Sequence, residues 1–339
     1  MDNGTTVEYD YGTIYDYDNA TLVTMCNTSK VNRFGATFLP TFYLVIFVLS
    51  LTGNVLVLLV IYKFERLSSV TNIILLNLIG SNLLFTFVLP FWAVYHSSSW
   101  VFGQPMCKIV RATLNVGFKS SVLFLTLMTF DRYLAIVHAV AMNQHRTKRY
   151  ALLACALVWL VCMLAGIEGV LQYHVEYDPS LSYLCTSTKD EKWKKLVLYV
   201  DFTGFFLFPL LVVIFCYVRI IITVFSTRIS GKHKTLRIVF VILVLFFVCW
   251  TPYNVVKLIY ENKHSDCSTK ATYGKAKYVT HNIAHLYFCI NPVFYCFLGR
   301  KFQSHVRFLL VNYFPCLKEH VSLTNSKSTS FRSPQTMQE

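Results

Sequence analysis

Charged residues are scarce in this 339-residue chain: they make up 14% of it, whereas hydrophobic residues make up 55%. Soluble proteins carry about a quarter charged residues, so the composition excludes an ordinary soluble protein. Four stretches contain no Asp, Glu, Lys or Arg, and they run from Phe34 to Tyr62, Leu67 to Cys107, Ile238 to Val256 and Tyr278 to Gly299. Because a membrane-spanning helix needs roughly 20 residues, the sequence predicts a protein that crosses the membrane several times.

The sequence also lacks the marks of several functional classes. No repeat of about 20–50 residues and no duplicated half is visible, which argues against a transporter built from repeats. Acids, His and Cys form no cluster with catalytic or metal-ligand spacing, so we expect no enzyme, no cofactor and no metal. His281 and His285, four residues apart on one helical face, are able to share a metal, but helix packing is the favoured interpretation. The N-terminal residues lack the apolar core of a cleavable signal peptide.

The apolar stretches predict an all-α membrane protein, a bundle of seven transmembrane helices. The expected spans lie near 38–62, 72–95, 107–133, 150–171, 196–222, 236–259 and 277–298. Lys and Arg collect in the loops on one side of the bundle, among them Lys63, Arg146 and Arg228, and the positive-inside rule makes that side cytoplasmic. We therefore expect a plasma-membrane protein with an extracellular N-terminus. This orientation accounts for the net charge of +14, so membrane lipid and not nucleic acid is the expected partner.

The orientation divides the chain into four parts. They are an extracellular acidic tail over 1–35, the seven-helix bundle over 36–299, a short amphipathic eighth helix over 300–314 and a cytoplasmic Ser/Thr-rich tail over 315–339. The extracellular tail carries three N-glycosylation sequons, at Asn3, Asn19 and Asn27. On the cytoplasmic side, Cys316 follows the amphipathic segment and is a candidate for palmitoylation.

The extracellular tail is acidic and aromatic although the protein as a whole is basic. Residues 8–18 read EYDYGTIYDYD, in which four tyrosines alternate with acidic residues. These tyrosines are Tyr9, Tyr11, Tyr15 and Tyr17. Few aliphatic residues flank them, so the pattern predicts a solvated tail and not a packed domain.

Three motifs lie in the predicted spans. The third span ends in DRYLAIVHAV (131–140), the sixth contains CWTPYN (249–254) and the seventh contains NPVFY (291–295). The last two each place a proline inside a helix, where it frees a backbone carbonyl and bends the helix. Together and in this order, the motifs resemble those of rhodopsin-like (class A) G-protein-coupled receptors, and the resemblance covers residues 38–310.

The local sequence narrows this resemblance. LPFW (89–92) and HKTLRIVFVILVLFFVCWTPYN (233–254) are similar to chemokine receptors, the CC type most closely, with the XC type near. The resemblance implies two extracellular disulfides, Cys107–Cys185 and Cys26–Cys267. It also implies that the tail captures a small basic chemokine and that its tyrosines are sulfated, which adds negative charge for steering. The implied role is chemotaxis and calcium signalling through a heterotrimeric G protein of the Gi type, with arrestin and receptor kinases as further partners.

The resemblance also implies two sets of site residues. The chemokine's flexible end is expected to enter the bundle near Trp92, Leu114, Trp193, Tyr253 and His281. Activation and G-protein coupling are expected to involve Asp131, Arg132, Tyr133, Trp250, Pro252, Asn291, Pro292 and Tyr295. In this mechanism Arg132 is released from Asp131 to meet the G protein, and agonist shifts a two-state bundle through its higher affinity for the active form.

The chain departs from the family's pattern at two notable positions. Asn82 stands where the family usually has an Asp that helps to bind sodium, and His281 stands where a ligand-contacting Glu is usual. We expect weak sodium modulation, because an amide offers a hard cation only a neutral oxygen. Hydrogen bonding of Asn82 to Asn54 and Asn291 is the alternative role. The retained Asp-Arg-Tyr motif favours signalling, and a decoy receptor that internalises chemokine without signalling is the alternative function.

Other membrane-protein classes fit less well. A retinal protein needs a Lys in its seventh span, and residues 278–299 contain none. An amine receptor would resemble its relatives in having an Asp in the outer third span, and residues 108–130 contain no acid. An ion channel or transporter is an alternative function, although polar residues that face inward are sparse.

Lys119 is expected to lie near the middle of the third span, about 18 Å from either end of the helix. An ionised Lys at that depth costs roughly 2.5–3.5 kcal/mol on insertion scales and needs a partner or a wet cavity. Asp201 is the one other full charge that we expect well inside a span. The sequence therefore predicts a buried ion pair of Lys119 with Asp201, with a hydrated cavity around Lys119 as the alternative.

Overall fold

The computed structural model describes residues 29–142, 144–179, 182–187, 190–226, 233–262, 267–298, 303–306 and 308–309. Several predictions fall outside these residues. They are sulfation at Tyr9, Tyr11, Tyr15 and Tyr17, glycosylation at Asn3, Asn19 and Asn27, the Cys26 half of the second disulfide, and palmitoylation at Cys316.

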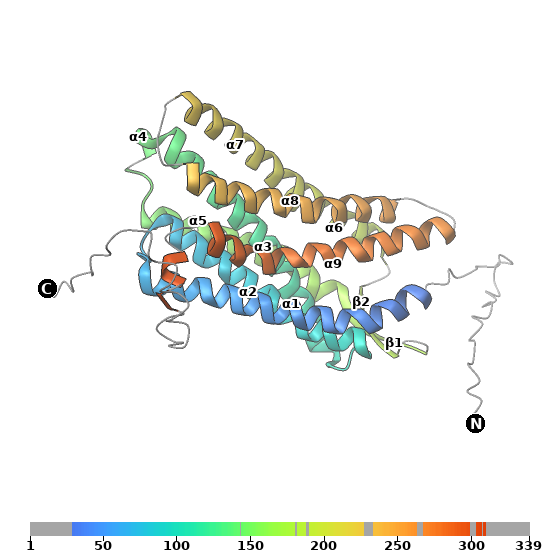
Figure 1. Ribbon diagram of the computed structural model, residues 1–339. Coiled ribbons are helices and arrows are strands. Elements are labelled where there is room, and N and C mark those ends of the chain that lie inside the picture. The colour runs from blue at the N-terminus through green and yellow to red at the C-terminus, as the bar shows by residue number, and fades with distance from the viewer. Residues whose placement is uncertain are drawn as a thin grey trace.

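Long helices lie side by side and form one bundle (Figure 1). They are α1 (Ser29–Phe64), α2 (Val70–Ser97), α3 (Gly103–Val137), α5 (Lys148–Gln172), α6 (Glu191–Phe202), α7 (Phe208–Ser226), α8 (His233–Asn262) and α9 (Cys267–Leu298). The short helix α4 (Ala139–Met142) follows α3 at one end of the bundle. Helix α3 occupies the centre, because it packs against α2, α5 and α7.

The predicted seven-helix fold is confirmed. Each expected span coincides with one long helix, except that the fifth span is built from α6, a π turn and α7. Five of the spans in the described part of the chain are long and apolar enough to cross a membrane, and they cover 38–64, 70–97, 103–137, 148–172 and 191–226. The helices extend beyond the predicted boundaries, because charged and polar residues are able to continue a helix into water once the apolar segment has ended.

The outer surface of the bundle is apolar, as a lipid-facing surface requires. Leu153 on α5 and Phe225 on α7 are 72% and 84% exposed, whereas Phe85 and Phe124 are buried between the helices. Residues 303–306, in the segment predicted as the eighth helix, are also helical. There the ring of His305 stacks on Phe64 at the end of α1, with ring centroids 4.4 Å apart.

The fifth span is not one continuous α-helix. Residues Thr203–Leu207 form a π turn, η1, between α6 and α7. Such turns contain one residue more than an α turn and occur frequently at functional sites. Asp201 lies in α6 just before η1, and Pro209 lies in the first turn of α7.

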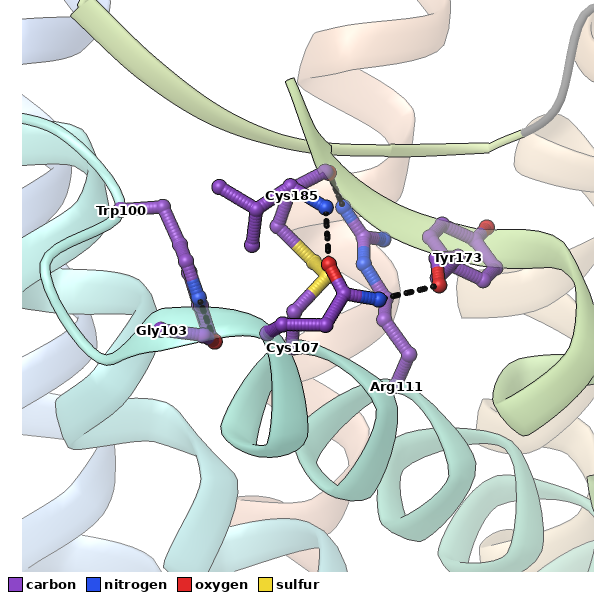
Figure 2. The surroundings of a disulfide bond; sticks show 8 residues. Trp100, Gly103, Cys107, Arg111, Tyr173 and Cys185 are labelled. Carbon is purple, nitrogen blue, oxygen red and sulfur yellow. Dashed lines mark hydrogen bonds between the residues drawn. A yellow bond between two sulfur atoms is a disulfide. The ribbon is translucent and has the colours of Figure 1, made fainter. Parts of the chain in front are cut away.

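A β-hairpin covers the end of the bundle that is predicted to be extracellular, here called the outer end, and the hairpin was not predicted from the sequence. Strand β1 (Tyr173–Asp178) pairs antiparallel with β2 (Ser182–Ser187), and Val175 stands opposite Cys185. The predicted disulfide between Cys107 and Cys185 is confirmed, so the hairpin is fixed to the first turns of α3 (Figure 2). Two residues at the base of the hairpin, Tyr173 and Ser187, line the cavity described below.

Helices α3 and α5 approach each other closely because α5 presents two glycines to α3. A Cβ atom placed on Gly169 would lie 2.6 Å from the backbone nitrogen of Ala112, and one on Gly166 would lie 2.4 Å from Cγ2 of Val116. No side chain larger than hydrogen fits at Gly169 unless a helix moves. This contact sets the distance between two helices that line the outer cavity.

Candidate ligand cavity and cytoplasmic coupling site

A cavity of about 520 Å³ lies at the outer end of the bundle, between α3, α5, β1, α6, α8 and α9. Three of the five predicted ligand-contacting residues line it, namely Trp193, Tyr253 and His281. Trp92 and Leu114 are not among the residues that line it. Trp92 is buried beneath the guanidinium of Arg111, which lies 4.2 Å from the centroid of the Trp92 ring.

Arg111 was not predicted as a site residue, but it connects the disulfide with the cavity. Its guanidinium lies 4.6 Å from the Tyr173 ring centroid, and Nη2 donates a hydrogen bond to the carbonyl of Cys185 at 3.3 Å (Figure 2). A cation between two aromatic faces is stabilised by the ring quadrupoles. The sequence does hold a signal for this role, because Arg111 lies one helical turn after Cys107 and so on the same face of α3.

The two predicted buried charges lie together below the cavity. Lys119 Nζ is 2.9 Å from Oδ1 of Asp201, and the Lys119 side chain is 3% exposed. The same ammonium donates a hydrogen bond to the carbonyl of Ala165 at 3.3 Å and lies 5.1 Å from the centroid of the Phe205 ring. The structure therefore places the pair between α3 and the segment just before η1.

The pair of Lys119 and Asp201 does not stand alone, contrary to the expectation from the sequence. Glu168 on α5 places Oε2 3.9 Å from Lys119 Nζ and accepts a hydrogen bond from Asn115 at 3.1 Å. Lys257 on α8 places Nζ 4.0 Å from Oδ2 of Asp201. The pair is thus part of a cluster, which the sequence pattern missed because Glu168 and Lys257 stand near the extracellular ends of their predicted spans.

The histidine pair in α9 packs against aromatic rings. His281 and His285 have ring centroids 4.2 Å apart, and the Tyr253 ring lies 4.9 Å from His281. His285 also contacts Phe85 at 5.0 Å. Among the described residues no group of three or more His, Cys, Asp or Glu side chains has the geometry of a metal site. These contacts fit the packing interpretation.

Asn82 takes part in a buried hydrogen-bond network between α1, α2 and α3. Its Nδ2 donates to Oδ1 of Asn54 at 3.3 Å, and its Oδ1 accepts from Ser121 at 2.9 Å. Asn54 donates in turn to the carbonyl of Ser50 at 2.8 Å. The predicted contact between Asn82 and Asn54 is confirmed. The side chain of Asn291 lies outside the described residues.

At the opposite end of the bundle, which is predicted to be cytoplasmic, Asp131 is bound by a residue that the sequence did not indicate. Nε of Arg146 donates to Oδ1 of Asp131 at 2.6 Å, and Nη2 donates to Oδ2 at 2.7 Å. Thr71 on α2 donates to Oδ2 of the same carboxylate at 3.2 Å. Bidentate pairs of an arginine with a carboxylate have short hydrogen bonds and a defined orientation. The hydrogen bonds to Asp131 raise the pKa of the Arg146 guanidinium above its ordinary value.

The remaining activation residues surround this contact or lie in α8 and α9. Arg132 lines a cavity of about 940 Å³ at this end of the bundle, together with Arg146 and residues of α1, α2 and 304–305. The Tyr133 hydroxyl shares a hydrogen bond of 2.9 Å with Nε2 of His138. The ring centroids of Trp250 and Phe118 are 4.1 Å apart, with the ring planes tilted. Pro252 lies inside α8. The backbone of Asn291, Pro292 and Tyr295 belongs to α9, and their side chains lie outside the described residues.

Comparison with known proteins gives consistent matches. The profile of the 7 transmembrane receptor (rhodopsin family) matches residues 53–295. The chain is 39% identical to C-C chemokine receptor type 3 of Cavia porcellus over 293 residues, which cover 84% of this chain and 82% of that receptor. It is 37% identical to C-C chemokine receptor type 1 of Homo sapiens over 317 residues, with 90% and 86% covered. It is 38% identical to C-C chemokine receptor type 4 of Homo sapiens over 288 residues, with 83% and 80% covered.

Proposed function

Because the chain belongs to the chemokine receptors of the rhodopsin family of seven-transmembrane receptors, we propose that it binds a chemokine outside the cell and activates a G protein inside it. The acidic tail and the hairpin β1–β2 hold the globular body of the chemokine. The flexible amino-terminal segment of the chemokine then enters the outer cavity and reaches Tyr253 and His281. Binding shifts the population of the bundle toward its active form, since only a difference in affinity between two forms can do so.

One observation favours signalling over a decoy function. The carboxylate of Asp131 is bound by Arg146 and Thr71, and the next residue, Arg132, lines the cytoplasmic cavity. This arrangement keeps the retained Asp-Arg-Tyr motif at the proposed G-protein surface, which supports signalling. We therefore assign coupling to Asp131, Arg132 and Tyr133, and we take the G protein to be of the Gi type. Arrestin and receptor kinases act on the Ser/Thr-rich tail.

The proposal is tested by screening a panel of chemokines for calcium release in transfected cells, with and without pertussis toxin. We expect one or a few chemokines to act and the toxin to abolish the response. The variant Arg132→Ala should still bind the active chemokine and give no calcium signal. Chemokine uptake without any calcium or G-protein response would instead identify a decoy receptor, and an evoked current without G-protein involvement would identify a channel.

Replacing Tyr9, Tyr11, Tyr15 and Tyr17 by Phe is expected to weaken chemokine binding and to make the affinity less sensitive to salt. The substitution keeps the rings and removes the oxygen atoms that accept sulfate, so the steering charge falls. The measurement is the dissociation constant of the active chemokine at several NaCl concentrations. Wild-type receptor from cells that cannot sulfate tyrosine is the control and should behave like the variant. An unchanged affinity and salt slope would reduce the tail to a glycosylated spacer.

Exchange of potassium for sodium is expected to leave agonist affinity unchanged in the wild type and to lower it in Asn82→Asp. The amide of Asn82 is engaged by Asn54 and Ser121 and carries no charge for a hard cation, whereas the substituted carboxylate does. Agonist competition binding in the two salts at equal ionic strength measures the effect. A clear sodium effect on the wild type would contradict the weakened sodium site.

A further inference from the structure

The outer cavity carries more positive than negative charge. It is lined by five cationic residues, Arg111, Lys194, Lys195, Lys257 and Lys277, and by three carboxylates, Glu168, Glu191 and Glu261. Some of these charges neutralise one another. Lys277 Nζ lies 2.6 Å from Glu261 Oε1, so this cation and this carboxylate form a complete pair at the extracellular end.

The carboxylates at the inner end of the cavity are already engaged by Lys119. Asp201 lies 2.9 Å from Lys119 and 4.0 Å from Lys257, so the buried Lys119 is its close partner. Glu168 lies 3.9 Å from Lys119 and accepts a hydrogen bond from Asn115. Lys119 and Lys257 therefore share the carboxylate of Asp201, and Lys119 also lies near Glu168.

Lys257 is the cation of this set that lacks a close counter-charge. Among the described residues its nearest carboxylate is the shared Asp201, and its Nζ donates no hydrogen bond to any of them. Its side chain is 25% exposed, lines the cavity and lies beside the Tyr253 ring, 5.9 Å from the ring centroid. Arg111 differs, because Trp92, Tyr173 and the carbonyl of Cys185 surround it.

His281 accounts for the imbalance. It lines the same cavity as Lys257 and brings no carboxylate to it. A carboxylate at position 281 would supply a counter-charge for Lys257, whereas an imidazole supplies no negative charge. An ammonium at the end of an inserted peptide would add further positive charge in a space of low dielectric, where unbalanced charges are costly.

On the basis of the proposed function, we propose that Lys257 binds a carboxylate of the ligand. The receptor thereby selects chemokines with an acidic side chain in the segment that enters the cavity. The acidic side chain forms an ion pair with Lys257 and supplies the negative charge that His281 does not. Specificity of this kind depends on a cation whose nearest carboxylate among the described residues, Asp201, is held more closely by Lys119.

The test is a double-mutant cycle with the chemokine that gives the largest calcium response in the panel. The chemokine is made in its natural form and with each acid of its amino-terminal segment changed to the amide, Asp→Asn or Glu→Gln. The affinity of each chemokine form is measured for the wild-type receptor and for the Lys257→Gln variant. For the natural form we expect Lys257→Gln to weaken binding about tenfold or more, as close charge pairs across interfaces do. For one amide form the loss should shrink to within about twofold.

Lys277→Gln is the matched control, because it removes the same charge from the same cavity but from a lysine that Glu261 already pairs. This substitution should lower the affinity for the natural and the amide forms of the chemokine by the same factor. Surface expression, followed with an epitope tag, separates misfolding from lost binding.

Equal losses for the natural and amide forms on Lys257→Gln would overturn the proposal, as would an active chemokine with no acid in its amino-terminal segment. If no chemokine binds the wild type at any concentration, the proposed function itself is wrong. That result differs from one in which chemokine binds and Lys257 shows no coupling.

Discussion

Replacing Lys119 by Met is expected to remove most of the receptor from the cell surface. The substitution keeps the length of the side chain and deletes the charge that lies between Asp201 and Glu168. Two carboxylates would then face each other without the ammonium that both contact. Breaking a buried charge pair by removing one partner costs about 3–5 kcal/mol, and natural proteins have only about 5–15 kcal/mol of stability.

Asp201→Asn should have a smaller effect than Lys119→Met. In that variant Lys119 keeps Glu168 at 3.9 Å and the carbonyl of Ala165 at 3.3 Å, so its ammonium is still partly compensated. Surface expression in cells and thermal unfolding of purified receptor in nanodiscs measure both effects. Lys108→Met is the matched control, because it makes the same change near the extracellular end of the same helix and should resemble the wild type.

The exchange of the two charges tests the pair directly. Lys119→Asp combined with Asp201→Lys should recover part of the loss. Recovery will be incomplete, because the new carboxylate at position 119 would lie close to Glu168. Wild-type behaviour of both single variants, or a double variant no better than the worse single one, would show that the contact contributes nothing to stability.

Gly169→Ala is expected to be nearly as damaging as the loss of Lys119, although it adds only one methyl group. The added carbon would lie 2.6 Å from the nitrogen and 2.7 Å from the Cα of Ala112, and backbone atoms cannot turn aside as a flexible side chain does. Helices α3 and α5 must separate, which displaces Arg111 and Glu168 in the cavity. We expect reduced surface expression, and weaker chemokine binding by the receptor that still reaches the surface.

Gly80→Ala is the matched control for this substitution. Gly80 lies inside α2, and among the described residues no atom beyond its chain neighbours and the backbone of its own helix is within 4 Å of where its Cβ would be. Alanine is favoured over glycine in a helix by about 1 kcal/mol, so this variant should be as stable as the wild type or slightly more stable. Equal behaviour of the two alanine variants would mean that the close approach of α3 and α5 is not needed for folding.

The sequence predicted the transmembrane spans and the buried ion pair, because both follow from the cost of placing charge in lipid. The charge-free stretches indicated the spans because lipid excludes charge, and the depth of Lys119 indicated Asp201 because a buried ammonium needs a carboxylate. The hairpin β1–β2 was missed, since its short strands have no long alternating pattern and depend on the disulfide to α3. Arg146 was missed because a basic residue in a cytoplasmic loop looks like one of many, and only the folded loop brings it to Asp131.

Glu168 shows a different limit. It stood inside a predicted span, but one acidic residue near the outer end of an apolar segment is able to reach water at the membrane surface. Its contact with Lys119 depends on the close packing of α5 on α3, which the spacing of Gly166 and Gly169 permits. Sequence separation gives no measure of that distance between helices.

The π turn Thr203–Leu207 has a consequence for the rotational phase of the fifth span. One residue corresponds to about 100° around a helix, so the extra residue turns everything on its extracellular side by that angle relative to a regular helix. Asp201 therefore points at Lys119 only in a chain that keeps the insertion. If the fifth span were a regular helix from Pro209 outward, residue 201 would lie on a different face of that helix and would not point toward α3. Deleting a single residue from this turn should rotate the carboxylate away from α3 and abolish the ion pair, even though every charged side chain is still present.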